Sequence, residues 1–270
     1  MRKGSRMVIA AAPGQDGPQI DRPAPLVNLI QPPLSLSRTT LLLTRPRAAS
    51  ERFAAMLRGW PALGGLPVLI APLMEIVRLP VPRDVLKDAS GIVFTSVNAV
   101  EALGLPGAGL PAWCVGPATA QAAEAAGFTV RLVARDAEEL VATMTAAPEA
   151  GRLVHVGGRH RRGRVAERLT AAGWRCDPVC VYDQVPRPIG TAAQALLGGR
   201  DPVLVPVFSP RSAALFPRHA SAPLHLAAIS AAAAEAWAGP PPAAVRIAPK
   251  PDANGVARAL GALINTACSP

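Results

Sequence analysis

Three kinds of residue in this sequence could do chemistry: one phenol, hydroxyls that follow apolar runs, and arginines beside glycines. Tyr182 is the only tyrosine and ends the apolar run Val179-Cys180-Val181. A phenol has a pKa of about 10 and can donate a proton while neutral, so Tyr182 is a candidate general acid. Tyr182 could instead have a purely structural role, as an amphipathic residue at an interface inside the fold.

Small polar residues come directly after several apolar runs. The clearest case is Thr95-Ser96-Val97-Asn98, where hydroxyl and amide groups could bind an anion. Ser, Thr and Asn also cap helices, so this segment could serve only to begin a helix. Gly116 with Thr119 could likewise serve only close packing of a strand against a helix. The residues in such positions are Thr44, Arg45, Thr95, Ser96, Asn98, Gly116, Thr119, Ser209 and Ser230.

The segment Gly157–Arg164 combines glycines with a run of basic residues, among them Gly158 and Arg159. Glycines let an anion approach the backbone, and a helix that follows would offer its N-terminus. The segment matches neither nucleotide-binding glycine motif, so a nucleotide site is not expected. It fits an anion site and a solvated basic turn about equally.

The charge balance favours an anionic partner. The net charge is +10, and all 28 basic residues except Lys3, Lys87 and Lys250 are arginines. Arginine binds carboxylates and phosphates in a bidentate way. Most individual arginines are expected to lie solvated on the surface. A nucleic-acid-binding protein would also be basic, but aromatic residues make up 4% of the chain and no recognition motif occurs.

The chain repeats itself at an offset of 114 residues. Phe94-Thr95-Ser96-Val97-Asn98 has its counterpart in Phe208-Ser209-Pro210-Arg211-Ser212, and Gly59-Trp60 has its counterpart in Gly173-Trp174. A repeat of this length has the size of a small domain. The duplication alone would divide the chain near residue 150.

Each copy alternates apolar runs with alanine-rich helical stretches, which is the pattern of a parallel sheet covered by helices. We therefore expect an α/β protein with doubly wound parallel sheets, whose ligands bind at the carboxyl ends of the strands. The expected strands are 40–43, 91–94, 112–115, 130–133, 152–156, 203–208, 224–229 and 244–248; the expected helices are 48–58, 98–103, 119–126, 165–172 and 230–238.

The cysteines and histidines do not form metal-binding patterns. Cys114, Cys176, Cys180 and Cys268 are scattered without a CxxC motif, and the four histidines show no HxH or HExxH spacing. We expect reduced core thiols in a cytoplasmic protein and no metal site.

The first 37 residues are rich in proline and precede the repeating pattern. The apolar stretch 7–12 is shorter than a signal-peptide core, and no apolar run approaches the ~20 residues that span a bilayer. We expect a disordered extension, or a start codon placed too early, and no membrane association.

Taken together, the blocks resemble the uroporphyrinogen-III synthase family over residues 38–265. The matching blocks, in order, are Leu42–Pro46, Val93–Val100, Val115–Ala120, Gly173 before Val181-Tyr182, and Phe208–Ala213.

The resemblance implies two α/β domains of similar topology joined by two extended linker strands. One domain would combine 38–66 with 188–265, the other would span 76–180, and the linkers would be 67–75 and 181–187. This division differs from the cut near residue 150, and we follow the family.

The implied reaction is cyclisation of hydroxymethylbilane, a linear polycarboxylate tetrapyrrole, to uroporphyrinogen III with inversion of ring D and loss of water. No cofactor is implied. Tyr182 matches the family's linker tyrosine and would assist departure of the hydroxyl. In the second copy Ala233 stands where Thr119 stands in the first, which leaves Ser230 as the donor there. The implied substrate-binding residues are Arg45, Thr95, Ser96, Asn98, Gly116, Thr119, Gly158, Arg159, Ser209 and Ser230.

The resemblance further implies a monomer without nucleic acid, in transient contact with hydroxymethylbilane synthase. The alternatives are a two-domain protein that binds anions without chemistry and a nucleic-acid-binding protein. Turnover of hydroxymethylbilane separates the first alternative from the synthase, and a steep salt dependence would mark the second.

Overall fold

The computed structural model describes residues 38–146, 151–160 and 163–265. The expected extension 1–37, Arg161 and Arg162 of the basic segment, and Cys268 lie outside the described residues. Among those described, no helix is both long enough and apolar enough to cross a membrane.

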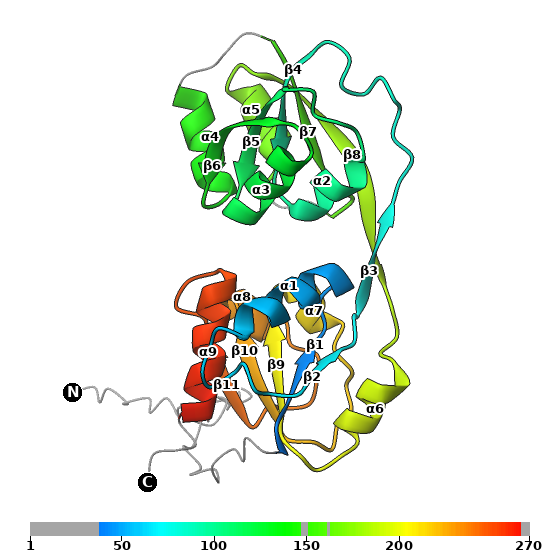
Figure 1. Ribbon diagram of the computed structural model, residues 1–270, viewed down its shortest axis with the longest axis vertical. Coiled ribbons are helices and arrows are strands. Elements are labelled where there is room, and N and C mark those ends of the chain that lie inside the picture. Colours follow the sequence, from blue (N-terminus) through cyan, green and yellow to red (C-terminus); the bar gives the residue numbers. More distant parts are fainter. Residues whose placement is uncertain (1–37, 147–150, 161–162, 266–270) are drawn as a thin grey trace, which may run out of the picture. The chain divides into compact units, whose positions relative to one another are not determined.

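The first sheet contains five parallel strands in the order β11-β10-β9-β1-β2 (Figure 1). It combines strands from both ends of the described chain, since β1 pairs with β9 through Thr40 and Val203. The strands are β1 (Thr40–Leu43), β2 (Val68–Ile70), β9 (Val203–Val207), β10 (Leu224–Ala228) and β11 (Ala244–Ile247).

The second sheet contains six strands in the order β3-β8-β7-β4-β5-β6. All neighbours are parallel except β3, which runs antiparallel to the long strand β8. The strands are β3 (Met74–Arg78), β4 (Ala89–Phe94), β5 (Pro111–Val115), β6 (Thr129–Ala134), β7 (Arg152–Gly158) and β8 (Arg175–Pro186).

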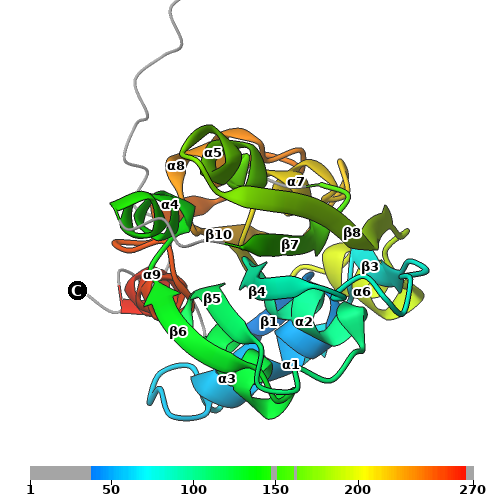
Figure 2. The same ribbon diagram turned by 90° about the horizontal axis from the view of Figure 1, so that it is seen from above.

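Helices cover both faces of each sheet. On the second sheet, α2 and α3 lie on one face and α4 and α5 on the other (Figure 2). On the first sheet, α1 and α9 pack on one face and α6, α7 and α8 on the other. The helices are α1 (Arg47–Leu57), α2 (Val97–Leu103), α3 (Pro117–Ala125), α4 (Ala137–Ala146), α5 (Val165–Ala171), α6 (Thr191–Leu197), α7 (Pro210–Ala214), α8 (Ala231–Glu235) and α9 (Ala253–Asn265).

The strands are apolar because both of their faces are buried. In β1, Leu41 and Leu43 contact the cluster that contains Phe53, whereas Leu42 between them contacts the opposite cluster with Ala213. All three leucines are at most 1% exposed. Burial of one such side chain is worth about 1.5–3 kcal/mol, so the central strands hold both helical layers.

The sequence predictions of element type are confirmed. Each of the eight expected strands overlaps a strand of the structure, and each of the five expected helices overlaps a helix. The duplication is also visible, since β9-β10-β11 and β4-β5-β6 occupy matching places in the two sheet orders, as do β1 and β7. The structure is therefore α/β with two parallel-dominated sheets of similar topology.

Candidate active site

The second sheet reverses its strand order between β4 and β7. The chain leaves β4 for α2 on one face and leaves β7 for α5 on the other. The carboxyl ends of two strands that diverge in this way form the crevice where α/β sheets bind ligands. Thr95, Ser96 and Asn98 follow β4. Gly158 ends β7, and Arg159 follows it. Five predicted site residues thus lie at this strand reversal.

Tyr182 lies beside the crevice, on β8. Its Cα partner on β7 is Gly158, and the Arg159 backbone N–H donates to the Tyr182 carbonyl at 2.9 Å. The side chain is 6% exposed and packs in the cluster that contains Val100 and Val156. Burial raises the pKa of the phenol above 10, while hydrogen bonding with Ser96 and, more weakly, Asn98 acts in the opposite direction. The phenol is therefore protonated at neutral pH.

The hydroxyls that follow the strands cap the helices. The Ser96 Oγ accepts from the Asn98 N–H at 3.2 Å, and the Ser209 and Ser230 Oγ atoms accept from the N–H groups of Ser212 and Ala233 at 3.1 and 3.3 Å. All three serines are half-buried, so each oxygen can cap a helix and still contact a ligand. Capping and binding are therefore compatible here.

The predicted site residues Gly116 and Thr119 lie at the start of α3 and differ from these serines. Gly116 caps α3 with a φ of +82°, a conformation that favours glycine, and its N–H already donates to the Ala134 carbonyl. The Thr119 side chain is 4% exposed. Ala233, which replaces Thr119 in the second copy, is fully buried in an apolar cluster. Thr119 and Ala233 thus both lie in the core of their sheets, whereas Gly116 is half-buried.

Arg159 is held by a neighbouring carboxylate. Its Nε lies 2.8 Å from Asp183 Oδ2, and His160 Nε2 lies 3.7 Å from Asp183 Oδ1. The arginine is exposed and the aspartate is half-buried. This ion pair fixes the segment after β7 to the strand that carries Tyr182.

The first sheet has its own reversal, between β1 and β9. The chain leaves β1 for α1 and leaves β9 for α7 on the opposite face. Arg45 follows β1, at the repeat offset of 114 from Arg159, and Ser209 follows β9. The two crevices thus occupy equivalent places in the two sheets.

Arg45 has no acidic partner in the part of the chain that the structure describes. Its guanidinium carbon lies 4.1 Å from the centre of the Phe208 ring, a cation–π contact. Burial, with added repulsion from Arg52, lowers the pKa of Arg45 to about 10. The charge remains at neutral pH, so this half-buried guanidinium can bind a carboxylate.

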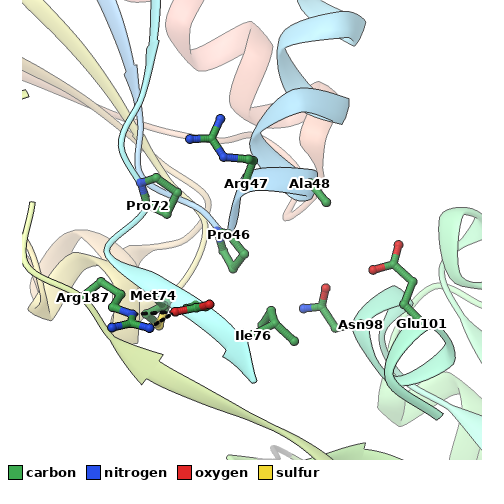
Figure 3. Close-up of a pocket in the computed structure, with 10 residues that line it drawn as sticks. Pro46, Arg47, Ala48, Pro72, Met74, Ile76, Asn98, Glu101 and Arg187 are labelled. Atoms are coloured by element: carbon green, nitrogen blue, oxygen red, sulfur yellow. Dashed lines mark hydrogen bonds and ion pairs between the residues drawn. The ribbon is translucent and has the colours of Figure 1, made fainter. Parts of the chain in front are cut away.

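Pro46, the residue after Arg45, lines a pocket of about 480 Å³ (Figure 3). It is lined by Asn98 and Glu101 of α2, by β3, and by the start of α1. Glu75 in its wall is paired with Arg187, and Glu101 is paired with Arg52 at 3.3 Å. Asn98 is the predicted site residue that lines this pocket. The full lining is Pro46, Arg47, Ala48, Pro72, Met74, Glu75, Ile76, Asn98, Glu101 and Arg187.

Arg211 and the pocket residues other than Asn98 were not predicted from the sequence. Arg211 on α7 donates from Nη2 to the Gln184 carbonyl of β8 at 3.0 Å, and its Nε is buried without a partner in the described part of the chain. Arg187 and Glu75 lie 112 positions apart and meet only because β3 pairs with β8. Arg211 could have been noticed because it lies inside the repeated block after Phe208.

Fold and site define a two-sheet α/β protein in which paired strand-end crevices carry hydroxyls, a half-buried guanidinium and a protonated phenol. A family model described as uroporphyrinogen-III synthase HemD matches residues 61–258. The chain therefore belongs to the uroporphyrinogen-III synthase family, whose members are cyclising lyases of tetrapyrrole biosynthesis. This confirms the expected family and favours it over both binding-protein alternatives.

A solved structure supports the fold. The crystal structure of uroporphyrinogen-III synthetase from Helicobacter pylori 26695 is similar, with 15% identity, a TM-score of 0.59, and coverage of 84% of this chain and 99% of that one. A mutant uroporphyrinogen III synthase from Thermus thermophilus gives 16% identity, a TM-score of 0.49, and coverage of 84% and 98%. The comparison with curated proteins gave no match.

Proposed function

We propose that the chain cyclises hydroxymethylbilane to uroporphyrinogen III at the two strand-end crevices, with Tyr182 as the general acid. The single observation that supports this best is the position of Tyr182. It is the only phenol of the chain, it lies on β8 beside Gly158 at the strand reversal, and it interacts with Ser96 and Asn98. A phenol is protonated at neutral pH, as a general acid must be before the reaction begins.

In the proposed first step, the Tyr182 phenol hydrogen-bonds to the terminal hydroxyl of the substrate. The pyrrole nitrogen lone pair expels this hydroxyl, which takes up a proton and leaves as water, and an azafulvene remains. Because burial disfavours the phenolate, the hydrogen bond to the leaving oxygen counts for more than complete proton transfer from Tyr182.

The substituted α-carbon of ring D then attacks the azafulvene and forms a spiro intermediate. That intermediate fragments and closes again with ring D reversed, and a proton lost from the pyrroles balances the proton taken up by the leaving hydroxyl. Geometry is the main requirement, since unassisted closure gives the unreversed isomer I. We assign the control of geometry to contacts with the substrate carboxylates.

Arg45 is the strongest candidate for such a contact, because it is charged, half-buried and without an acidic partner among the described residues. The strand-end hydroxyls and backbone N–H groups would bind further carboxylates. Gly158 and Arg159 are weaker candidates, since Tyr182 covers the first and Asp183 binds the second. Gly116 and Thr119 are also weaker candidates, since the Gly116 N–H already donates to Ala134 and Thr119 is buried. The remaining proposed contacts are Thr95, Ser96, Asn98, Ser209 and Ser230.

The test is to generate hydroxymethylbilane in situ, add the purified protein, oxidise the products and separate porphyrin isomers I and III. We expect dominant isomer III. Tyr182→Phe keeps the ring and removes the proton, so it should lower the rate by at most the ~10²–10⁴-fold typical of one general acid. Unchanged turnover in Tyr182→Phe would remove Tyr182 from the chemistry, and isomer I alone would refute the activity.

The division into domains 38–66 plus 188–265 and 76–180, the monomeric state, the cytoplasmic location and the transient contact with hydroxymethylbilane synthase are also proposals. Sedimentation of the protein alone, and then with hydroxymethylbilane synthase, measures the assembly state and the contact directly.

A further inference from the structure

Gly158 and Tyr182 meet at an irregularity of the β7–β8 pair. Gly157 is the Cα partner of Cys180, and the next residue, Gly158, is the partner of Tyr182, so Val181 is an extra residue on β8. An extra residue of this kind redirects the side chains next to it. The Arg159 N–H donates to the Tyr182 carbonyl at 2.9 Å and fixes the register on the far side.

The Tyr182 ring occupies the space where a side chain of residue 158 would begin. A Cβ added to Gly158 would lie 2.6 Å from both Cε2 and Cζ of the ring and 3.0 Å from its hydroxyl oxygen. A Cβ atom in a folded protein essentially never lies 2.6 Å from another heavy atom, so either the ring or the strand would have to move. The ring is stiff and packed among core residues on its other side, which leaves it little room to yield.

The backbone at Gly158 does not require glycine. Its φ is outside the left-handed region that Gly104, Gly116 and Gly163 occupy. Space for the Tyr182 ring is therefore the reason that the structure gives for a glycine at this position.

We propose that Gly158 is a positioning residue for Tyr182: its missing side chain sets the phenol ring at the crevice beside Ser96 and Asn98. This inference rests on the proposed function, because it matters for turnover only if Tyr182 takes part. It also replaces direct substrate contact as the main role of Gly158. A side chain at position 158 acts on the reaction only by displacing the phenol.

The first test is Gly158→Ala, measured by two independent readouts. The turnover number for isomer III should fall about as far as it falls in Tyr182→Phe, with a much smaller change in KM. Because Tyr182 is the only tyrosine, alkaline titration of the tyrosinate absorbance reports its pKa directly. Displacement from the buried position should bring that pKa down toward 10. An unchanged pKa and turnover number would overturn the proposal.

The matched control is Gly190→Ala. Gly190 has a φ of −69°, and a Cβ there would meet no described atom within 4 Å. This variant should keep the tyrosine pKa, the turnover number and KM of the parent protein.

A double-variant cycle separates positioning from substrate contact. Tyr182→Ala removes the ring and makes room for a Cβ at position 158, so Gly158→Ala should change turnover by less than about two-fold in that background. The same loss in both backgrounds would overturn the proposal and assign Gly158 to the substrate.

The double variant also guards against misfolding, because it should fold even if Gly158→Ala alone does not. If Tyr182→Phe keeps full turnover, the proposed function of Tyr182 fails, but the absorbance titration still decides whether Gly158 positions the ring.

Discussion

Replacing Arg45 by methionine should stabilise the protein and weaken its binding of substrate. Arg45 buries much of a charged guanidinium at the carboxyl end of β1 without an acidic partner among the described residues. Methionine has a similar length and no charge, so it can cover Phe208 without the cost of desolvating a cation. A residue that is kept for binding is expected to show this opposition of stability and function.

The magnitude follows from the pKa of Arg45, which burial and Arg52 lower from 12.5 to about 10. At about 1.4 kcal/mol for each pKa unit, the charge costs the folded state up to about 3 kcal/mol at neutral pH. The variant also loses the cation–π contact with Phe208, worth about 1–2 kcal/mol for a largely desolvated guanidinium. We expect a net stabilisation of about 1–2 kcal/mol. Because the folded-state pKa is lowered, the cost is full at neutral pH and is relieved as the pH rises past about 10.

The assay pairs urea unfolding with steady-state turnover. Loss of a charge-assisted contact of about 1.5–3 kcal/mol should raise KM for hydroxymethylbilane roughly 10- to 100-fold. Arg58→Met is the control, since Arg58 is exposed at the end of α1 and its loss removes the same charge. That control should leave both the unfolding midpoint and KM close to those of the parent protein.

A destabilised Arg45→Met variant with unchanged KM would refute this reasoning. It would mean that the stack on Phe208 is worth more than the charge costs, and that Arg45 has a structural role. A KM increase of the same size in Arg58→Met would instead attribute the effect to net charge.

Three further predictions concern the rest of the structure. The Tyr182 phenol should titrate above pH 10 in the native protein and near 10 in urea, so stability should fall as the pH rises above 10; native titration at 10 would contradict its burial. Gly91→Ala should lower the free energy of unfolding in urea by about 1–3 kcal/mol, because the added Cβ would overlap the Trp113 ring. In the control Gly261→Ala in α9, the added Cβ would meet no described atom within 4 Å, so this variant should be as stable as the parent protein or more stable. Burial lowers the pKa of His225, so the free energy of unfolding should be unaffected by this group above about pH 6.5 and should fall as the pH drops below that value. In His225→Leu, acid unfolding should lack this loss of stability.

The two sheets could be predicted well from the sequence because their central strands are buried on both faces. Runs such as Val203–Val207 are apolar at every position, and few other structures need that pattern. Strand β8 was not among the expected strands, because Pro178 and alternating polar residues interrupt its twelve-residue length. Only the apolar run 179–181 and the linker 181–187 implied by the family resemblance indicated part of it. Helix α7 is five residues long, which is too short to show helical periodicity.

The site was less predictable, because its features depend on tertiary pairing. Nothing in the sequence indicated that Asp183 would bind Arg159 while Arg45, at the equivalent place, stays without an acidic partner among the described residues. Nor could the sequence show that Thr119 is buried. The strand-end hydroxyls were found because they stand where parallel sheets bind ligands, whichever fold family is involved.

The strand orders also have a consequence for the way the chain is made. Every strand of the second sheet lies between residues 74 and 186, so that sheet can form while the ribosome is still synthesising β9, β10 and β11. Met74 and Pro186 are Cα partners in the β3–β8 pair, so completion of the second sheet brings the two ends of this long insertion together. What remains for β1 and β9 is closure of a short loop, with the small entropy loss that a short loop entails. Vectorial synthesis therefore suits this topology, in which β1 can pair early with β2 and waits for β9 until the second sheet is complete.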